Sequence, residues 1–300
     1  MKKICFLIVM LSCGLLYNAQ SQKQVILDAD TGNEVDDLYA IVRALIEPSW
    51  DIIALNGTQW QASHWAVDNS MEESHRLNQV LVSYLEMENE VPTLRGGNDR
   101  MYDWGDMAQH SAATYEIIKQ ARRLPEGEKI PVIALGALTN VASAIYIAPD
   151  IENKIEVYWL GTSYNFETNT SKRTDFNAIM DVQATEIMLS SQVTMHIIPV
   201  NVAGKMTFDF EETKNRLQGI HPLADYIIDR WYTHLDGGRY QRTIWDLALI
   251  SIMIFPEWTE EVKTESFENK NTYLYKDIDA NAIREEFFNT TTDYLKKLQK

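Results

Sequence analysis

The most informative segment of this chain is VILDADTGNEVDD, residues 25–37. It opens with a short aliphatic run that predicts a buried strand. Asp28 and Asp30 lie at the carboxyl end of that strand, and a glycine follows them in a position that suits a turn. Asp36 and Asp37 then lead into an apolar pattern with helical spacing. The segment is typical of a strand–turn–helix unit in an α/β fold.

Acidic side chains are concentrated here, with five of them between residues 28 and 37. Like charges at such short separations repel one another unless a cation or hydrogen-bond donors neutralise them. In open α/β sheets, ligands bind at the carboxyl ends of the strands. Carboxylate oxygens are preferred ligands of calcium and magnesium, so the segment predicts a site for a hard cation. A plainer interpretation exists for any single member, since Asp36 could simply cap the helix.

Two other acidic motifs fit the spacing poorly. A calcium EF-hand loop beginning at Asp28 would need Gly at its sixth position and Glu at its twelfth, where this chain has Asn33 and Tyr39. Phosphatases of the haloacid dehalogenase type carry Asp-x-Asp-x-Thr, but here Thr31 comes one residue early. A metal-dependent phosphatase is therefore the last of the alternatives.

Composition limits the classes of partner. The 300 residues carry a formal net charge of -16 at pH 7, and 45% of them are hydrophobic. This charge argues against nucleic acid or an anionic membrane surface as a partner. The length and apolar content suit one α/β domain with a substantial core.

The first 21 residues have the features of a signal peptide. A pair of lysines precedes an apolar run, residues 4–16, which is too short to favour a membrane-spanning helix. We expect cleavage between residues 19 and 21, export to the periplasm or the cell exterior, and no membrane insertion of the mature chain. Both cysteines, Cys5 and Cys13, lie in this segment, so the mature chain would have neither disulfides nor thiol chemistry. Lipid attachment at Cys13 is the alternative.

Strands and helices are predicted in alternation along the rest of the chain. Apolar runs predict strands, and helical periodicity predicts the segments between them. The predicted strands are residues 51–57, 130–135, 155–160, 193–200 and 272–275; the predicted helices are residues 38–46, 70–87, 112–122, 139–147, 182–190 and 280–298, and residues 208–254 are predicted to be chiefly helical. This alternation favours a single α/β domain over residues 22–300, with a mainly parallel, Rossmann-like central sheet flanked by helices.

Three further motifs follow the first in chain order. LGALTN, residues 135–140, has the form of a strand, a turn and a helix. Asn169 precedes DFNAIMD, residues 175–181, and WDLA, residues 245–248, opens an apolar helix. Together with the acidic segment, these motifs resemble those of the inosine–uridine-preferring nucleoside hydrolases. The chain departs from the family pattern in three ways: a loop longer by two residues at residues 33–35, Asp175 in place of Glu, and Trp245 where many members have His.

The resemblance implies a calcium site and a general base. Three carboxylates and a backbone carbonyl would hold the ion, and Asp30 would also activate the metal-bound water that attacks the N-glycosidic bond. The implied ligands are Asp30, Asp37, Asp246 and the carbonyl of Leu135. Asp28 would support these ligands from behind without touching the ion.

The family's ribose-binding segment implies the sugar contacts. They correspond here to Asp36, Asn169, Asp175 and Asn177. Gln61 lies near a position at which the family often carries Asn, and it would face the sugar. Taken alone, Asn169 would also suit a turn.

Trp245 bears on the leaving base. An indole cannot donate the proton that a histidine would supply, so stacking on the base would take its place, as in the purine-preferring branch that this chain resembles. Trp104 or Trp60 would form the opposite face of the base site, and His110 and His234 are candidate acids. Taken alone, Trp245 would also suit a hydrophobic core.

The resemblance thus implies calcium-dependent hydrolysis of ribonucleosides, with purines preferred, to ribose and free base by a homodimer or homotetramer. Two alternatives stay open. One is a hydrolase of the same fold that acts on another riboside or glycoside, and the other is a nucleoside-binding protein without turnover. Retention of Asp30, Asp37 and Asp246 argues against the second.

Overall fold

The computed structural model describes residues 22–101, 107–235 and 238–299. The predicted signal peptide, residues 1–21, and Trp104 lie outside these ranges, so the structure bears on neither prediction. Within the described ranges, no helix has the combination of length and apolar character that crossing a membrane requires.

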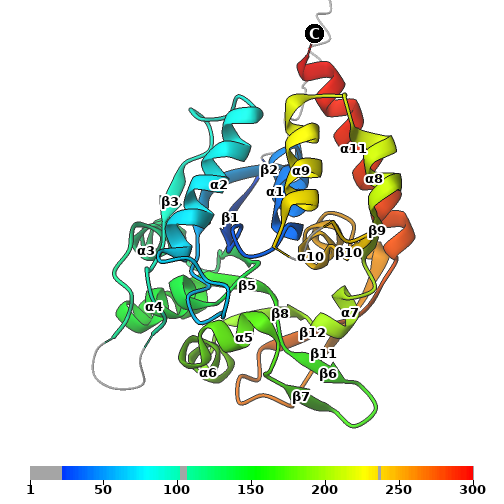
Figure 1. Ribbon diagram of the computed structural model, residues 1–300. Helices are drawn as coiled ribbons and strands as arrows, with labels where there is room; N and C mark the ends of the chain where they lie inside the picture. The colour runs from blue at the N-terminus through cyan, green and yellow to red at the C-terminus, as the bar shows by residue number, and fades with distance from the viewer. Residues whose placement is uncertain (1–21, 102–106, 236–237, 300) are drawn as a thin grey trace, which may run out of the picture.

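A central sheet of eight strands forms the middle layer of the molecule (Figure 1). Neighbouring strands run parallel, except that the edge strand β11 is antiparallel to β12. In spatial order the strands are β11 (Thr259–Lys263), β12 (Thr272–Ile278), β8 (Thr194–Ile198), β5 (Ile155–Leu160), β4 (Ile130–Ala134), β1 (Lys23–Ala29), β2 (Trp50–Gly57) and β3 (Thr93–Arg95). The predicted single α/β domain with a mainly parallel sheet is confirmed.

Helices cover both faces of this sheet, and each face has its own hydrophobic cluster. Val25 and Leu27 of β1 belong to one cluster and Ile26 to the other, as expected for a strand buried on both faces. The helices are α1 (Asp36–Leu45), α2 (Ser70–Tyr84), α3 (Ala112–Arg123), α4 (Thr139–Ile147), α5 (Phe176–Met180), α6 (Val182–Ser190), α7 (Val200–Ala203), α8 (Phe210–Leu217), α9 (Pro222–Thr233), α10 (Trp245–Ile254) and α11 (Ala280–Leu298), with 3-10 turns at Pro149–Lys154 and Pro256–Trp258.

Several short strands are present that the sequence did not predict. Besides β3 and β11, β6 (Ser163–Asn165) pairs with β7 (Thr170–Lys172), and β9 (Thr207–Asp209) pairs with β10 (Gln241–Thr243). The β9–β10 ribbon lies partly within residues 208–254, where α8, α9 and α10 account for the expected helical content. Strands of three residues carry too little alternation to be recognised, and β9 finds its partner more than thirty residues away.

The topology creates an opening at the carboxyl end of β1. From β1 the chain moves outward to β2 and β3, and it then returns to β4 on the other side of β1. In doubly wound folds, ligands bind at such a point, where the connections leave in opposite directions. The N–H of Leu135, just after β4, donates to the carbonyl of Asp28 at 2.8 Å and fixes the ends of the two strands side by side.

A histidine within the sheet is held between two carboxylates. His196 on β8 hydrogen-bonds to Glu261 at 2.5 Å and to Glu156 at 3.1 Å, and its ring stacks between those of Tyr158 and Tyr273. Burial opposes the charge on the imidazole, but the bonds to the two glutamates outweigh it and raise the pKa of His196 to about 8.

His196 should therefore make stability depend on pH. Because its folded-state pKa lies above the value of about 6.5 in an unfolded chain, its stabilising effect is complete below pH 6.5 and is lost as pH rises through about 8. We expect His196→Gln to lower the free energy of unfolding by about 2 kcal/mol at pH 6 and by much less at pH 9. Urea unfolding of both proteins at the two pH values measures this. The same difference at both values would contradict it.

Candidate active site

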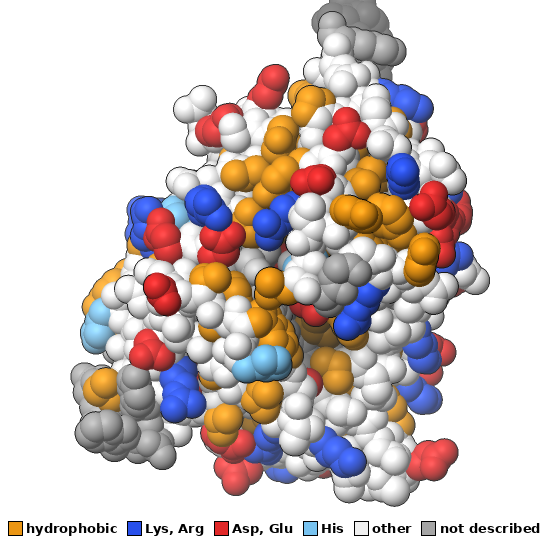
Figure 2. Space-filling view, viewed as in Figure 1, with side chains coloured by type: hydrophobic (Ala, Val, Ile, Leu, Met, Phe, Trp, Pro, Cys, Tyr) orange, Lys and Arg blue, Asp and Glu red, His pale blue; other side chains and the backbone are white. Residues whose placement is uncertain are grey.

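A cavity of about 470 Å³ opens above the carboxyl ends of four neighbouring strands, β1, β4, β5 and β8. Each strand places a lining residue at or just beyond its end: Asp30, Leu135, Leu160 and Asn201, respectively. The other lining residues are Asn33, Glu34, Asp36, Asp37, Trp65, Asp175, Phe176, Asn177, Val200, Trp245 and Asp246. In the view of Figure 2, hydrophobic side chains gather near the middle of the molecule, among charged side chains of both signs.

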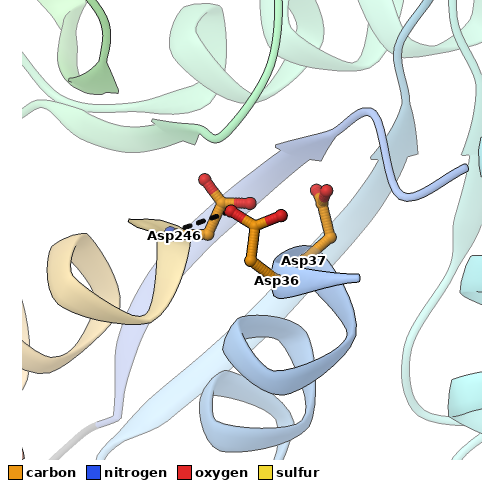
Figure 3. Close-up of side chains that lie close together, drawn as sticks. All are labelled: Asp36, Asp37 and Asp246. Carbon is orange, nitrogen blue, oxygen red and sulfur yellow. Dashed lines mark hydrogen bonds between the residues drawn. The ribbon is translucent and has the colours of Figure 1, made fainter. Parts of the chain in front are cut away.

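Three carboxylates converge in this cavity. Asp36 and Asp37 come from the N-terminus of α1, and Asp246 comes from the N-terminus of α10 (Figure 3). One oxygen of each lies within 4.8 Å of the others, and the N–H of Asp246 donates to Oδ2 of Asp36 at 3.4 Å. The N-cap position of α1 is Val35, so Asp36 is not the simple capping residue that the alternative interpretation assumed. Both helices direct the positive ends of their dipoles at the cluster, which favours carboxylates there.

Asp30 adds a fourth carboxylate from the end of β1. Its side chain is 2% exposed, and its charge interacts with those of Asp36 and Asp37. Gly136, just beyond β4, packs directly against it, because a Cβ at this position would lie 2.7 Å from Cγ and Oδ1 of Asp30. The glycine therefore makes room for the Asp30 carboxylate.

These carboxyl groups are hard to ionise while no cation is bound. Burial, with added repulsion from Glu34, raises the pKa of Asp36 to about 7. The pKa values of Asp30, Asp37 and Asp246 are raised well above the usual range, by burial first and by the neighbouring aspartates second. The described residues that line the cavity include no lysine, arginine or histidine to offset these charges.

The cluster fits a metal ion. Oδ2 of Asp30, Oδ1 of Asp37 and Oδ1 of Asp246 are buried and have no hydrogen-bond partner among the described residues. Buried polar atoms without partners are unfavourable, and a divalent cation bound at the cluster would offset part of this cost. A ligand set made only of oxygen favours a hard ion such as calcium or magnesium.

Asn177 connects the ends of β4 and β5. Its Nδ2 donates to the carbonyl of Leu135 at 2.6 Å and to the carbonyl of Leu160 at 2.9 Å. A carbonyl oxygen has two lone pairs, so this bond leaves Leu135 able to bind an ion as well. Asp175 caps α5, since its Oδ1 accepts from the N–H of Ala178 at 3.2 Å, and its buried Oδ2 has no partner among the described residues.

Two tryptophans line the cavity. Trp245 is the first residue of α10 and precedes Asp246. Trp65, from the loop after β2, stacks on Phe176 with ring centroids 5.5 Å apart and ring planes 20° apart. Nε1 of Trp65 donates to Oδ1 of Asn33 at 3.1 Å, which orients the indole. Flat apolar side chains beside a group of carboxylates suit a ligand that carries both an aromatic ring and several hydroxyl groups.

Three of the predicted site residues lie outside the cavity lining. Asn169 is exposed, with φ of 52°, in the turn between β6 and β7, a position that fits its alternative interpretation as a turn residue. Gln61 is turned toward Ser70, whose hydroxyl donates to its Oε1 at 3.2 Å. Asp28 is fully buried behind the cluster and accepts from Nδ2 of Asn140 at 2.9 Å; burial raises its pKa to about 7.

The remaining candidates for the base site also lie apart from the cavity lining. Trp60 is buried, with Nε1 donating to Oγ of Ser74 at 3.3 Å. His110 hydrogen-bonds to the hydroxyl of Tyr115 in an exposed position. His234 lies closer to the cavity, because its Nε2 hydrogen-bonds at 3.1 Å to the carbonyl of Asn33, which is a lining residue.

Seven lining residues have no counterpart among the predicted site residues: Asn33, Glu34, Trp65, Leu160, Phe176, Val200 and Asn201. The first two belong to the longer loop at residues 33–35, whose polar side chains were an available signal. Phe176 lies between two predicted sugar-binding residues in the sequence. The sequence around Trp65 and Asn201 did not predict a role in the site. A long loop brings Trp65 to the cavity, and the short helix α7 brings Asn201 there.

Comparison with known proteins agrees with this geometry. The family model described as inosine-uridine preferring nucleoside hydrolase matches residues 25–283. The chain belongs to this family. It is a nucleoside N-glycosyl hydrolase, and its substrates are small-molecule nucleosides. The family is metal-dependent, and the aspartate cluster is the group of described residues that could hold the ion.

Relatives of this nucleoside hydrolase differ in the base that their names specify. Probable uridine nucleosidase 2 of Arabidopsis thaliana is 24% identical over 286 residues, which cover 86% of this chain and 87% of the relative. A pyrimidine-specific ribonucleoside hydrolase of Escherichia coli is 24% identical over 203 residues, 63% of this chain and 64% of the relative. A solved purine-preferring ribonucleoside hydrolase from Gardnerella vaginalis has a TM-score of 0.68 at 19% identity, over 92% of this chain and 100% of that one. The structural likeness establishes the fold.

Gly136→Ala should impair this hydrolase by displacing Asp30. The added methyl group would lie 2.7 Å from the Asp30 carboxylate and equally close to Cγ2 of Thr58, so both side chains, or the backbone at residue 136, must move. We expect activity to fall about a hundredfold, because small misplacements of reacting groups have effects of this size. Ribose release measures it, with circular dichroism to confirm the fold. A folded variant with wild-type activity would contradict the close contact.

Proposed function

We propose that this protein is a calcium-dependent hydrolase of purine ribonucleosides that releases ribose and free base. One observation carries the proposal: the cavity is lined by two tryptophans and by three aspartates, each with a buried oxygen that has no hydrogen-bond partner among the described residues. The proposed ligands are Asp37, Asp246, Asp30 and the carbonyl of Leu135.

Asp30 is proposed as the general base. A bound calcium ion would polarise the attacking water and orient the ribose hydroxyls. Asp30 lines the cavity, and with one of its two carboxylate oxygens on the ion, the other would accept the proton of that water. Cleavage of the N-glycosidic bond develops positive charge on the sugar, and the surrounding carboxylates would stabilise it.

Asp36, Asp175 and Asn177 are proposed to hold the ribose. All three line the cavity, and Oδ2 of Asp175 has no partner among the described residues. A sugar hydroxyl would give this oxygen a hydrogen bond, whereas a nucleoside analogue without that hydroxyl would leave the oxygen unpaired. The bond from Ala178 to Oδ1 orients the Asp175 side chain for this contact.

Trp245 and Trp65 are proposed to hold the base. A purine offers a larger flat surface for stacking than a pyrimidine does, which supports the purine preference. The described cavity residues include no histidine, so we propose that stacking assists departure of the base while solvent supplies its proton.

The test is ribose release by the mature protein in calcium from inosine, guanosine, adenosine, uridine and cytidine. Purine-selective release would support the proposal. Pyrimidine-selective release would overturn the assignment of the base and agree with the names of the sequence relatives. No release from any of them, with calcium bound, would favour another glycoside or a nucleoside-binding protein. Activity on a phosphomonoester in magnesium would instead support a phosphatase.

Trp245→Ala is expected to lower kcat/KM for purine nucleosides by about tenfold to a hundredfold, the range found when a base loses an aromatic partner. The effect on uridine should be smaller, since a smaller ring loses less contact. Trp245→Phe is the matched control, because it keeps a stacking surface and should retain most of the purine activity. Equal effects of Trp245→Ala on purine and pyrimidine substrates would contradict the stacking role.

We also propose that the protein is exported and that it self-associates as a dimer or tetramer. The lysine pair and the apolar run within residues 1–21 support export. Mass spectrometry of the protein recovered from the producing cells would locate the cleavage site and detect any lipid on Cys13, and light scattering would measure the oligomer.

A further inference from the structure

Asn33, in the longer loop at residues 33–35, is held by hydrogen bonds to three different parts of the chain. Its N–H donates to the carbonyl of Asp30 at 2.8 Å, and its own carbonyl bonds to Nε2 of His234 at 3.1 Å. Its Oδ1 accepts from Nε1 of Trp65 at 3.1 Å. Asn33 is 7% exposed and lines the cavity. These bonds fix the backbone and the side chain of Asn33 close to the residue proposed as the general base.

Trp65 has two further contacts that restrict its indole. Its ring stacks on that of Phe176 with centroids 5.5 Å apart, and the ring of His64 packs edge-on against it with centroids 4.5 Å apart. Phe176 lies between Asp175 and Asn177, which are proposed to hold the ribose. Contacts between rings are less directional than a hydrogen bond, so they determine the plane of the indole more than its rotation within that plane.

The bond to Asn33 supplies the remaining restraint on the indole. A hydrogen bond from an N–H group prefers a nearly linear geometry, so this bond fixes the direction of the nitrogen edge. Trp65 lies in the loop between β2 and α2, outside any helix or strand, where the backbone alone constrains a side chain less. Because Asn33 is also bonded to Asp30, the indole is held at a defined position relative to the proposed general base.

We propose that Asn33 is a positioning residue, which holds the Trp65 indole ready to bind the base of the nucleoside; the inference rests on the proposed function. A side chain that is already ordered loses less conformational freedom when a ligand binds, so the affinity is higher. The competing explanation is a direct contact, because Asn33 lines the cavity and its Nδ2 would reach the substrate. The two roles need different atoms of one side chain: the acceptor Oδ1 for positioning and the donor Nδ2 for direct contact.

The experiment compares hydrolysis of inosine, at saturating calcium, by the wild type, Asn33→Ala and Asn33→Asp. Asn33→Ala removes the acceptor for the indole but keeps the backbone bond to Asp30. We therefore expect KM to rise about threefold to tenfold, the size expected for one hydrogen bond, with kcat little changed. Asn33→Asp keeps an acceptor oxygen in the same place, so its KM should stay close to the wild-type value.

Asn165→Ala is the matched control. Oδ1 of Asn165 also accepts hydrogen bonds, from the N–H groups of Glu167 and Thr168, but Asn165 is exposed and does not line the cavity. Its replacement should leave both KM and kcat unchanged.

A second measurement does not depend on turnover. In a proton–nitrogen NMR spectrum of the protein in calcium, the indole N–H signal of Trp65 is the one that Trp65→Phe removes. This signal should move upfield in Asn33→Ala, where the bond is lost, and stay near its wild-type position in Asn33→Asp. If Asn33→Ala does not fold, Trp65→Phe breaks the same bond from its other end and should also raise KM.

The outcomes separate positioning from direct contact and from a failure of the proposed function. Equal rises in KM in Asn33→Ala and Asn33→Asp would place Nδ2 on the substrate and overturn the inference, and so would an unchanged KM in Asn33→Ala. A further rise on adding Asn33→Ala to Trp65→Phe would also overturn it, because the bond is already absent there. Absence of hydrolysis in the wild type would instead overturn the proposed function. The calorimetric Kd of inosine for the wild type and the two Asn33 variants would then decide the role of Asn33.

Discussion

Asp30→Asn is expected to lower kcat for nucleoside hydrolysis by about a hundredfold to ten-thousandfold while the protein remains folded. The amide has nearly the same shape, so Gly136 can still pack against it, but it cannot accept a proton from water at neutral pH. Folding should not suffer, because burial already makes ionisation of Asp30 unfavourable and raises its pKa. Single-turnover ribose release together with a thermal melt measures both effects.

Asp279→Asn is the matched control for this change. Asp279 caps α11 by accepting from the N–H of Ala282 at 3.0 Å, it does not line the cavity, and asparagine is an equally good capping residue. Wild-type activity is expected. If Asp30→Asn also kept wild-type activity, another group would have to be the base, and the central assignment of the site would fail.

Asp246→Asn should remove most of the stabilisation by calcium. In the wild type, calcium at a hundred times its Kd should raise the free energy of unfolding by about 2.7 kcal/mol, whereas the variant, with one ligand removed, should gain little. In EDTA the variant should instead be more stable than the wild type by about 1–3 kcal/mol, because one of four mutually repelling buried carboxyl groups has been neutralised. Denaturant unfolding with calcium and with EDTA measures both, and an equal calcium response in the two proteins would contradict the assignment.

The same groups give the metal site a pH dependence of known sign. Burial raises the pKa of Asp36 to about 7 in the folded protein, so the folded state without metal takes up a proton that the unfolded state does not hold at neutral pH. Stability in EDTA should therefore increase as pH falls from about 8 toward 4. Calcium binding should weaken over the same range, because the ion needs ionised carboxylates. Calorimetric titration of calcium at pH 6 and pH 8 tests this, and tighter binding at pH 6 would contradict it.

Residues 25–37 could be interpreted from sequence because their information is local. A buried strand, a glycine turn and an acidic helix start occur within thirteen residues, and β1 and α1 form almost where the pattern places them. The alternation of longer strands and helices was likewise sufficient to predict a mainly parallel sheet. The three-residue strands were not predictable, since each depends on a distant partner.

The site shows the same division. Asp30, Asp37, Asp246 and Leu135 could be named in advance because their motifs resemble those of a known family. The structure brings them to the cavity because each directly follows a strand or opens a helix at the carboxyl edge of the sheet. Asn169 has a suitable residue type and spacing, yet the β6–β7 turn carries it away from the cavity lining. Nothing in its local sequence distinguishes those two outcomes.

The sequence by itself determined the fold class, the acidic cluster and the family of this nucleoside hydrolase, because these depend on short-range patterns and on motifs in a fixed order. The tertiary structure alone decided which side chains form the outer wall of the cavity. Trp65, Glu34 and Asn201 come from three different parts of the chain, and Glu34 is held by an arginine 208 residues away. Such contacts depend on how packed helices and loops meet, which local hydrophobic periodicity does not encode.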